Sequence, residues 1–154
     1  MELLKVIIFI LKIKIIHYGE IYRLISFHYF IKKLDLNIET LSILDIGFNK
    51  GLFRWYFLEV LGCFSYTGVE IDEEYLNKYP NTFYHDFENH KLKKKYNLIF
   101  CSHVLEHVKD DYHFLLNMVD SLDDNNGKTL IRVPKPTNEK IYLRSLNLKV
   151  AEDQ

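Results

Sequence analysis

Residues 41–51 read Leu-Ser-Ile-Leu-Asp-Ile-Gly-Phe-Asn-Lys-Gly. The first six are mostly apolar and branched, which predicts a strand buried on both faces of a parallel sheet. Gly47 and Gly51 then enclose Asn49, and helix-like apolar spacing follows at Leu52, Phe53, Tyr56, Phe57, Val60 and Leu61. A strand, a glycine turn and a helix in this order bring a ligand close to bare backbone at a helix N-terminus.

Composition limits the classes of protein that fit. The chain has 154 residues, which suits one domain with a real core. It carries 20 basic and 21 acidic side chains, a net charge of -1, so we expect no nucleic-acid partner. Its two cysteines, Cys63 and Cys101, lie far apart, which favours a reducing, cytoplasmic location over a disulfide scaffold.

The chain beyond residue 51 alternates between predicted strands and helices. Strands are predicted at Ser65–Ile71, Thr82–His85, Leu98–Ser102 and Thr129–Val133. Helices are predicted at Asp72–Tyr79 and Asp110–Leu122, and Phe87–Lys95 reads as a solvated loop or helix. This alternation predicts an α/β fold, a doubly wound and mostly parallel sheet whose ligands bind at the carboxyl ends of the strands.

The N-terminal part, residues 1–40, is predicted to be a helical segment packed on a core formed by residues 41–154. Leu3 to Ile16 is almost wholly apolar, interrupted by Lys5, Lys12 and Lys14. It is too short and too charged for a spanning helix, and no small-residue cleavage site follows. We expect one or two helices on the sheet, with a basic amphipathic anchor at a membrane surface as the alternative.

The glycine turn separates two ligand classes. A dinucleotide fingerprint needs glycines at its first, third and sixth positions, and from Gly47 two of the three fail. The stretch instead resembles motif I of class I S-adenosylmethionine-dependent methyltransferases, Asp/Glu-x-Gly-x-Gly-x-Gly. Asp45, Gly47 and Gly51 match this motif. Asn49 replaces the middle glycine, and Asn tolerates a left-handed backbone better than most residues.

The fourth strand carries the most specific resemblance. Ser102-His-Val-Leu-Glu-His-Val108 is similar to the stretch that follows this strand in the family, although Asn97 stands where an Asp is usual. The following helix, glycine turn and Leu-Ile-Arg-Val-Pro also agree in order and spacing. The resemblance covers about Leu41 to Pro134. It is closest to the branch that contains many small-molecule and cell-surface glycan methyltransferases.

The resemblance implies a set of contacts to S-adenosylmethionine. Glu70 would accept the ribose hydroxyls, Asp86 would receive the adenine amino group, and Phe87 would cover the ring. On the residues alone, Glu70 also reads as a surface acid beside a helix start and Asp86 as a loop cap. The full predicted set of cofactor-binding residues is Asp45, Gly47, Asn49, Gly51, Glu70, Asp86, Phe87 and Ser102.

Three side chains after the fourth strand are candidate catalytic residues. His103, Glu106 and His107 are expected nearest the transferable methyl group. His107 is the first candidate for a base, because an unperturbed imidazole titrates near neutral pH. A purely structural role for His107, and a backbone-fixing role for Glu106, remain open alternatives.

The same residues also match a rival motif. His103-x-x-Glu106-His107 fits the inverted zinc-peptidase pattern, in which two histidines one helical turn apart hold zinc and the glutamate acts as base. The motif directly follows a predicted buried strand, and the α/β pattern upstream would remain unexplained. We therefore predict no metal and keep a zinc hydrolase as the lesser alternative.

The C-terminal end departs from the family pattern. Family members continue past the fifth strand with a helix and a strand hairpin, whereas only residues 135–154 remain here. We expect the hairpin to be missing and the sheet edge to be bare unless a partner covers it. The leading prediction is a methyltransferase for a small-molecule or glycan/lipid precursor acceptor. The alternative is a non-catalytic S-adenosylmethionine-binding module or truncated subunit.

Overall fold

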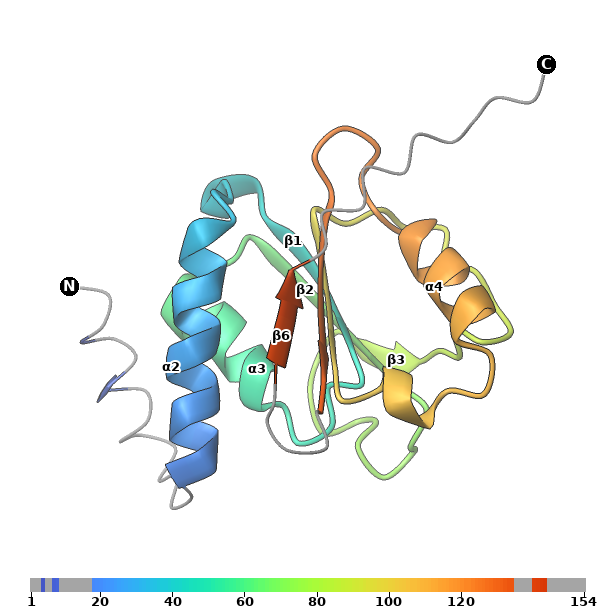
Figure 1. Cartoon of the computed structure of the whole chain (residues 1–154), viewed down its shortest axis with the longest axis horizontal. Helices are drawn as coiled ribbons and strands as arrows, with labels where there is room; N and C mark the ends of the chain where they lie inside the picture. The colour runs from blue at the N-terminus through green and yellow to red at the C-terminus, as the bar shows by residue number, and fades with distance from the viewer. Residues whose placement is uncertain (1–3, 5–6, 9–17, 135–139, 144–154) are drawn as a thin grey trace.

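A computed structural model describes residues 4, 7–8, 18–134 and 140–143 of the chain. Six strands form one sheet in the order β3-β2-β1-β4-β5-β6 (Figure 1). Their bounds are β1 Ser42–Ile46, β2 Ser65–Glu70, β3 Thr82–Tyr84, β4 Leu98–Ser102, β5 Lys128–Val133 and β6 Lys140–Leu143. The first five strands run parallel, which confirms the predicted α/β fold class.

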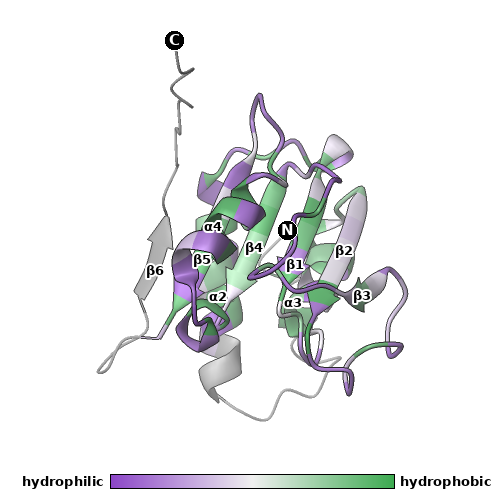
Figure 2. Cartoon of the chain, turned by 90° about the vertical axis from the view of Figure 1, so that its right-hand side faces the viewer, coloured by the Kyte–Doolittle hydropathy of each residue, from purple (hydrophilic) through white to green (hydrophobic). Residues whose placement is uncertain are grey.

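Side chains that alternate along the strands build a separate core on each face of the sheet. Helices α2, Tyr18–Lys33, and α3, Leu52–Trp55, cover one face, and α4, Asp111–Val119, covers the other (Figure 1). Buried members of the first core are Leu24, Phe27, Ile31, Ile43, Tyr56, Phe57, Leu98, Phe100 and Leu130. Buried members of the second core are Leu44, Ile46, Val69, Phe87, Ile99, Cys101, Phe114 and Met118. Burial on both faces explains why β1 and β4 are mostly apolar in sequence (Figure 2).

The helix after the glycine turn changes its winding. Only Leu52–Trp55 is α-helical, and Tyr56–Leu61 continues as a π-helix that ends at Gly62. Gly62 has a φ of 71°, the left-handed conformation that commonly ends a helix. A single turn of α-helix therefore stands between the glycine loop and the wider turn that buries Tyr56 and Phe57.

One predicted element was wrong. Residues 72–79 form a series of turns, not a helix, although Asp72 does accept a hydrogen bond from the Glu74 amide at 2.9 Å. The backbone bonds of Tyr75 and Leu76 reach back only three residues, and Asn77 adopts a φ of 65°. The cap signal was present, but the left-handed residue stops the turn from becoming a helix.

The sheet edge beside β5 is not bare, contrary to expectation. β6 pairs antiparallel with β5, and the register joins Leu130 to Leu143 and Val133 to Lys140. Residues 135–139 and 144–154 lie outside the described residues. The chain itself therefore covers this edge with one short strand.

The N-terminal segment is described in part. Helix α2 places Leu24, Phe27 and Ile31 in the first core, whereas residues 9–17, most of the predicted apolar segment, lie outside the described residues. Of the helices that the structure describes, none has the length and apolar character needed to cross a bilayer. The boundary at residue 40 stays a prediction.

Candidate functional site

Gly47 follows β1 directly and lies where its backbone must be bare. Its φ is 73°, and its amide donates to the Val69 carbonyl at 2.9 Å. A Cβ at this position would lie 2.2 Å from the Cγ2 atom of Val104. Both the backbone angle and the close approach of Val104 therefore require glycine.

Asn49 adopts the left-handed backbone with a φ of 46°. Its side-chain oxygen accepts the Lys50 amide at 2.7 Å, which keeps the turn tight. Gly51 ends the loop with a φ of 75° and packs against the ring of Tyr79, whose hydroxyl donates to the Lys50 carbonyl at 2.8 Å. The departure from the family motif at Asn49 therefore preserves the geometry of the glycine turn.

Glu70, the last residue of β2, faces this loop. One carboxylate oxygen accepts the Asn49 amide at 3.1 Å, and the other accepts the Ile71 amide at 2.9 Å. The same Glu70 oxygen also accepts the Asp72 amide at 3.4 Å, and Asp72 in turn accepts the Glu74 amide at 2.9 Å. Glu70 thus ties the ends of two neighbouring strands together and lines a cleft between them.

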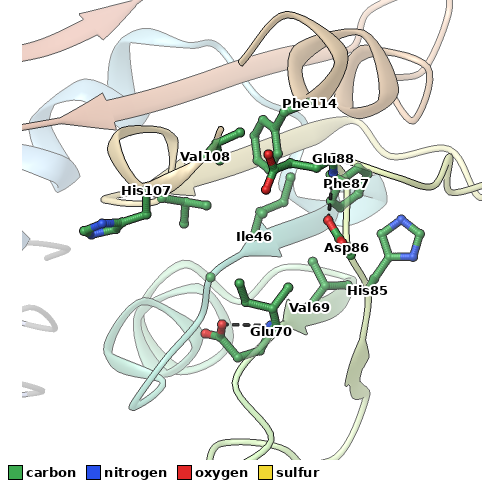
Figure 3. Close-up of a pocket in the computed structure, with 13 residues that line it drawn as sticks. Ile46, Val69, Glu70, His85, Asp86, Phe87, Glu88, His107, Val108 and Phe114 are labelled. Carbon is green, nitrogen blue, oxygen red and sulfur yellow. Dashed lines mark hydrogen bonds between the residues drawn. The ribbon is translucent and has the colours of Figure 1, made fainter. Parts of the chain in front are cut away.

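That cleft, called here the apolar cleft, lies at the carboxyl ends of the strands (Figure 3). Its walls are mainly apolar side chains, together with three acidic residues, Glu70, Asp86 and Glu88; the apolar members are Ile46, Val69, Ile71, Phe87, Val104, Val108 and Phe114. His107 lies at one end of the cleft and His85 at the other. An apolar slot with paired acceptors suits a flat heterocycle joined to a sugar.

Asp86 and Phe87 are adjacent in sequence but have different surroundings. The carboxylate of Asp86 accepts the side-chain amide of Asn89 at 2.7 Å and the backbone amide of Glu88 at 2.9 Å, and these bonds lower its pKa. Asp86 is therefore both a loop cap and a cleft acceptor. Phe87 is buried, and the Asn117 side chain holds its carbonyl at 2.8 Å.

A second cleft, called here the polar cleft, lies on the other side of the Gly47 loop. It contains Asp45, Asn49, Ser102, His103 and the guanidinium groups of Arg23 and Arg132. It is the larger of the two, at about 340 Å³ against about 60 Å³ for the apolar cleft. Gly47 lines both clefts, so a single extended ligand passing over its bare backbone would reach from one to the other.

Asp45 is the buried acid of the polar cleft. It is 2% exposed, and the Tyr66 hydroxyl donates to its carboxylate at 2.7 Å. Burial raises the pKa of Asp45 to about 7, although the Tyr66 hydrogen bond acts in the opposite direction and nearby Glu70 adds to the rise. Asp45 therefore changes charge near neutral pH, within reach of a ligand in this cleft.

His103 stands directly after β4 in a left-handed backbone conformation. Its φ is 58°, and its amide donates to the Arg132 carbonyl at 2.9 Å. The ring nitrogen Nδ1 lies 3.3 Å from a carboxylate oxygen of Glu106. Burial, followed by the charges of Arg132 and Arg23, lowers the pKa of His103, so the imidazole is neutral at pH 7. A neutral imidazole can accept a proton.

The three candidate catalytic residues do not share one cleft. His103 lines the polar cleft, Glu106 contacts His103, and His107 lines the apolar cleft. The zinc motif needs His103 and His107 on one face of a helix. The structure lacks this arrangement, because the short 3₁₀ helix spans only Leu105–His107 and His103 precedes it. The described part of the chain holds no group of three or more metal-ligating His, Cys, Asp or Glu side chains.

Three cationic residues of the polar cleft, Arg23, Lys50 and Arg132, are not among the predicted site residues. Arg132 is a buried charge within β5, and an arginine inside the otherwise apolar run Leu-Ile-Arg-Val was an available signal. Arg23 comes from α2, and no local pattern distinguishes it from an ordinary surface residue. The packing of Val104 against Gly47 could not be predicted from local sequence either, because the two residues lie 57 positions apart.

Comparison with known proteins fits this geometry. A family model described as a methyltransferase domain matches residues 19–151. The chain belongs to this family. This agrees with the cofactor predicted from the motifs, S-adenosylmethionine; S-adenosylhomocysteine is bound in the solved structures of coclaurine N-methyltransferase and BpumL. The match includes α2 as well as the predicted core.

The individual relatives share less than a third of their aligned residues with this chain. The ubiquinone biosynthesis O-methyltransferase of Rickettsia typhi is 29% identical, over 82% of this chain and 56% of its own length. An S-adenosylmethionine-dependent methyltransferase structure from Clostridium acetobutylicum superposes with a TM-score of 0.61 at 15% identity, covering 82% of this chain and 54% of that one. The plantazolicin methyltransferase BpumL, solved with S-adenosylhomocysteine, gives 0.57 at 23% identity, covering 69% and 44%. These solved structures support the fold. The chain spans about half the length of the curated relative that it matches.

The residues present fit the cofactor of the family. Gly47 lines both clefts, and Val104 packs against its bare backbone where a Cβ would otherwise stand. The apolar cleft offers Glu70 and Asp86 as acceptors beside apolar walls, and the polar cleft offers charged groups of both signs. This division matches a nucleoside at one end of a ligand and an amino acid at the other.

Proposed function

We propose that the chain is an S-adenosylmethionine-dependent methyltransferase that acts on a small molecule or a glycan or lipid precursor. The observation that carries the proposal is the meeting of two chemically different clefts at Gly47. Glu70, Asp86 and Phe87 would hold the nucleoside in the apolar cleft. Asp45, Asn49 and Ser102 would hold the amino-acid end in the polar cleft, and Gly51 would shape the loop.

The chemistry asked of the protein is mainly positioning. The cofactor, when bound, supplies a methyl group on a sulfonium, and the neutral thioether of S-adenosylhomocysteine is a good leaving group. The walls of the polar cleft would hold the acceptor close to that methyl group, which lowers the entropy cost of the reaction. For a hydroxyl acceptor, His103 would take the released proton, because its pKa is lowered and its Nδ1 atom is oriented by Glu106.

The charges of the polar cleft favour an acceptor that carries negative charge. Arg23, Lys50 and Arg132 contribute three basic groups, whereas Asp45 is half neutral near pH 7. A hydroxylated aromatic acid combines a nucleophilic hydroxyl group with an anionic carboxylate. The relative from Rickettsia typhi is an O-methyltransferase by name, which supports an oxygen nucleophile.

The test measures the rate of methyl transfer by two histidine variants, using a panel of catechols and hydroxybenzoates as acceptors. We expect His103→Asn to lower the transfer rate by about 10²–10⁴-fold while the affinity for S-adenosylhomocysteine is unchanged. Transfer by the unaltered chain should fall as the pH drops through the lowered pKa of His103, because the protonated ring cannot act as a base.

His107→Asn is the matched control, because His107 lines the other cleft. It should alter cofactor affinity more than the transfer rate. The opposite pattern, with transfer lost in His107→Asn and kept in His103→Asn, would return the base to His107. Saturable cofactor binding without transfer to any acceptor would select the non-catalytic binding module instead.

A further inference from the structure

The outer face of α2 combines exposed apolar side chains with basic ones. Tyr22, Ile25 and Tyr29 are 73%, 43% and 59% exposed, and they recur at the spacing of one helix face. Lys33 lies on the same face, with its ammonium 4.3 Å from the ring centre of Tyr29. The opposite face is the buried one, formed by Leu24, Phe27 and Ile31. We call Tyr22, Ile25, Tyr29 and Lys33 the α2 outer face.

Single exposed aromatic residues are common on protein surfaces, so the grouping on one helix matters more than each residue. The contrast within this chain is α4, on the far side of the sheet (Figure 1). Tyr112 and Leu116 of α4 are also exposed, at 66% and 41%, but acidic Asp111 and Asp120 accompany them. The exposed apolar pair of α4 thus has acidic neighbours, one of which, Asp120, is ion-paired with Lys91, whereas the charged neighbour on the α2 outer face is Lys33.

The sequence charge follows the same division. Residues 1–33 contain six basic and two acidic side chains, whereas the whole chain has a net charge of -1. From Ile21 to Lys33 there are three basic residues and no acidic one. Leu4, Ile7 and Ile8, in the preceding segment, are exposed as well. Basic residues interleaved with exposed tyrosine and isoleucine are typical of a helix that lies in the plane of a membrane interface.

We propose that the α2 outer face is a docking surface for an anionic lipid bilayer. Tyr22, Ile25 and Tyr29 would enter the headgroup region, where amphipathic rings are favoured, and Lys33 would face the negative lipid surface. The buried face of α2 would stay on the sheet, so docking needs no unfolding of the helix. The basic charge favours an anionic surface, and the exposed tyrosine and isoleucine side chains on one helix face favour a lipid interface.

Helix α2 contributes residues both to the docking surface and to the polar cleft. The same helix that exposes Tyr22 sends Arg23 into the wall of the polar cleft. An acceptor carried in the bilayer would therefore approach the cleft along the docked side of the molecule. This second step rests on the proposed function, whereas lipid binding itself does not require cofactor or methyl transfer.

The experiment is co-sedimentation of the full chain, without cofactor, with phosphatidylcholine vesicles that contain or lack phosphatidylglycerol. We expect the chain to sediment with the anionic vesicles, and added salt to weaken the binding. The double variant Tyr22→Ser/Ile25→Ser should bind roughly tenfold more weakly, because it removes two apolar groups from the contact. Lys33→Gln should reduce the preference for anionic vesicles.

The matched control is Tyr112→Ser/Leu116→Ser, which removes a similar exposed pair from α4. It should bind vesicles like the unaltered chain. Circular dichroism and S-adenosylhomocysteine affinity should be unchanged in both double variants, which separates docking from folding and from the proposed function. Equal losses in the two variants, or no vesicle binding by the unaltered chain, would overturn the proposal. Self-association that is lost only in the α2 variant, without vesicle binding, would also overturn it and assign the face to a second copy.

Discussion

At the scale of single residues, Gly47 is the position with the least freedom. Its left-handed backbone and the 2.2 Å approach of Val104 to a hypothetical Cβ both exclude other residues. Gly62 offers a natural comparison, since its φ of 71° is similar but no atom lies within 4 Å of its Cβ position. The two glycines therefore separate the cost of backbone strain from the cost of overlap.

We expect Gly47→Ala to destabilise the fold more than Gly62→Ala. Both variants carry about 1–2 kcal/mol of left-handed strain, and Gly47→Ala adds about 1–3 kcal/mol of overpacking against Val104. Urea unfolding measures both values. Val104→Ala combined with Gly47→Ala should recover the overpacking part, and equal destabilisation by the two single variants would contradict this reading of the loop.

Asp45 gives a prediction about pH. Its pKa is about 7 in the fold, against about 3.9 in an unfolded chain, so the folded state binds more protons between these values. The stability contributed by this group is therefore highest at low pH and is lost as the pH rises from about 4 to about 7. Asp45→Asn should remove a decline on the order of a few kcal/mol from the curve of unfolding free energy against pH. Parallel curves for the two proteins would show that burial does not raise this pKa.

At the scale of elements, the sequence was most informative where apolar runs must be buried on both faces. The predicted β4 bounds are identical to the observed Leu98–Ser102, and β1, β2, β3 and β5 differ by one residue at an end. The segment that begins at Asp72 was wrongly predicted to be a helix. A capping residue, two acidic residues and a following proline are the usual signals for the start and end of a helix. β6 was missed because its pairing with β5 depends on a contact between separate segments. Arg23 and Arg132 were missed for the same reason, since only the fold brings them to one cleft.

The start of β4 shows how a departure from the family is accommodated. The Asn97 side-chain oxygen accepts both the Ser42 amide at 3.0 Å and the Ser42 hydroxyl at 2.8 Å. The Asn97 amide in turn donates to the Ser42 carbonyl at 3.1 Å. Both side-chain contacts need only an acceptor, which the usual Asp would also supply.

We therefore expect Asn97→Asp to keep most of the stability of the chain. Asn97→Ala should cost about 1–3 kcal/mol, because it leaves half-buried donors of Ser42 without their acceptor. Thermal or urea unfolding of the two variants is the measurement. An Asn97→Asp protein as unstable as Asn97→Ala would show that the amide hydrogens, and not the oxygen, join β1 to β4.

At the scale of the whole molecule, the sheet places two clefts on either side of one bare loop. β1 supplies Asp45 and leads into Gly47, β2 supplies Glu70, and β4 supplies Ser102 and leads into His103. We expect one S-adenosylmethionine molecule to span both clefts, with its ribose on Glu70. This contact is charge-assisted, so its loss should be measurable in binding alone.

The most direct test is calorimetric titration with S-adenosylhomocysteine of the unaltered chain, of Glu70→Ala and of Glu73→Ala, an exposed acid three residues further on. We predict saturable one-to-one binding by the unaltered chain, a loss of about 1.5–3 kcal/mol in Glu70→Ala, and no change in Glu73→Ala. Unfolding curves would establish that each protein is folded. An unchanged dissociation constant in folded Glu70→Ala, or no binding by the folded unaltered chain, would contradict the account.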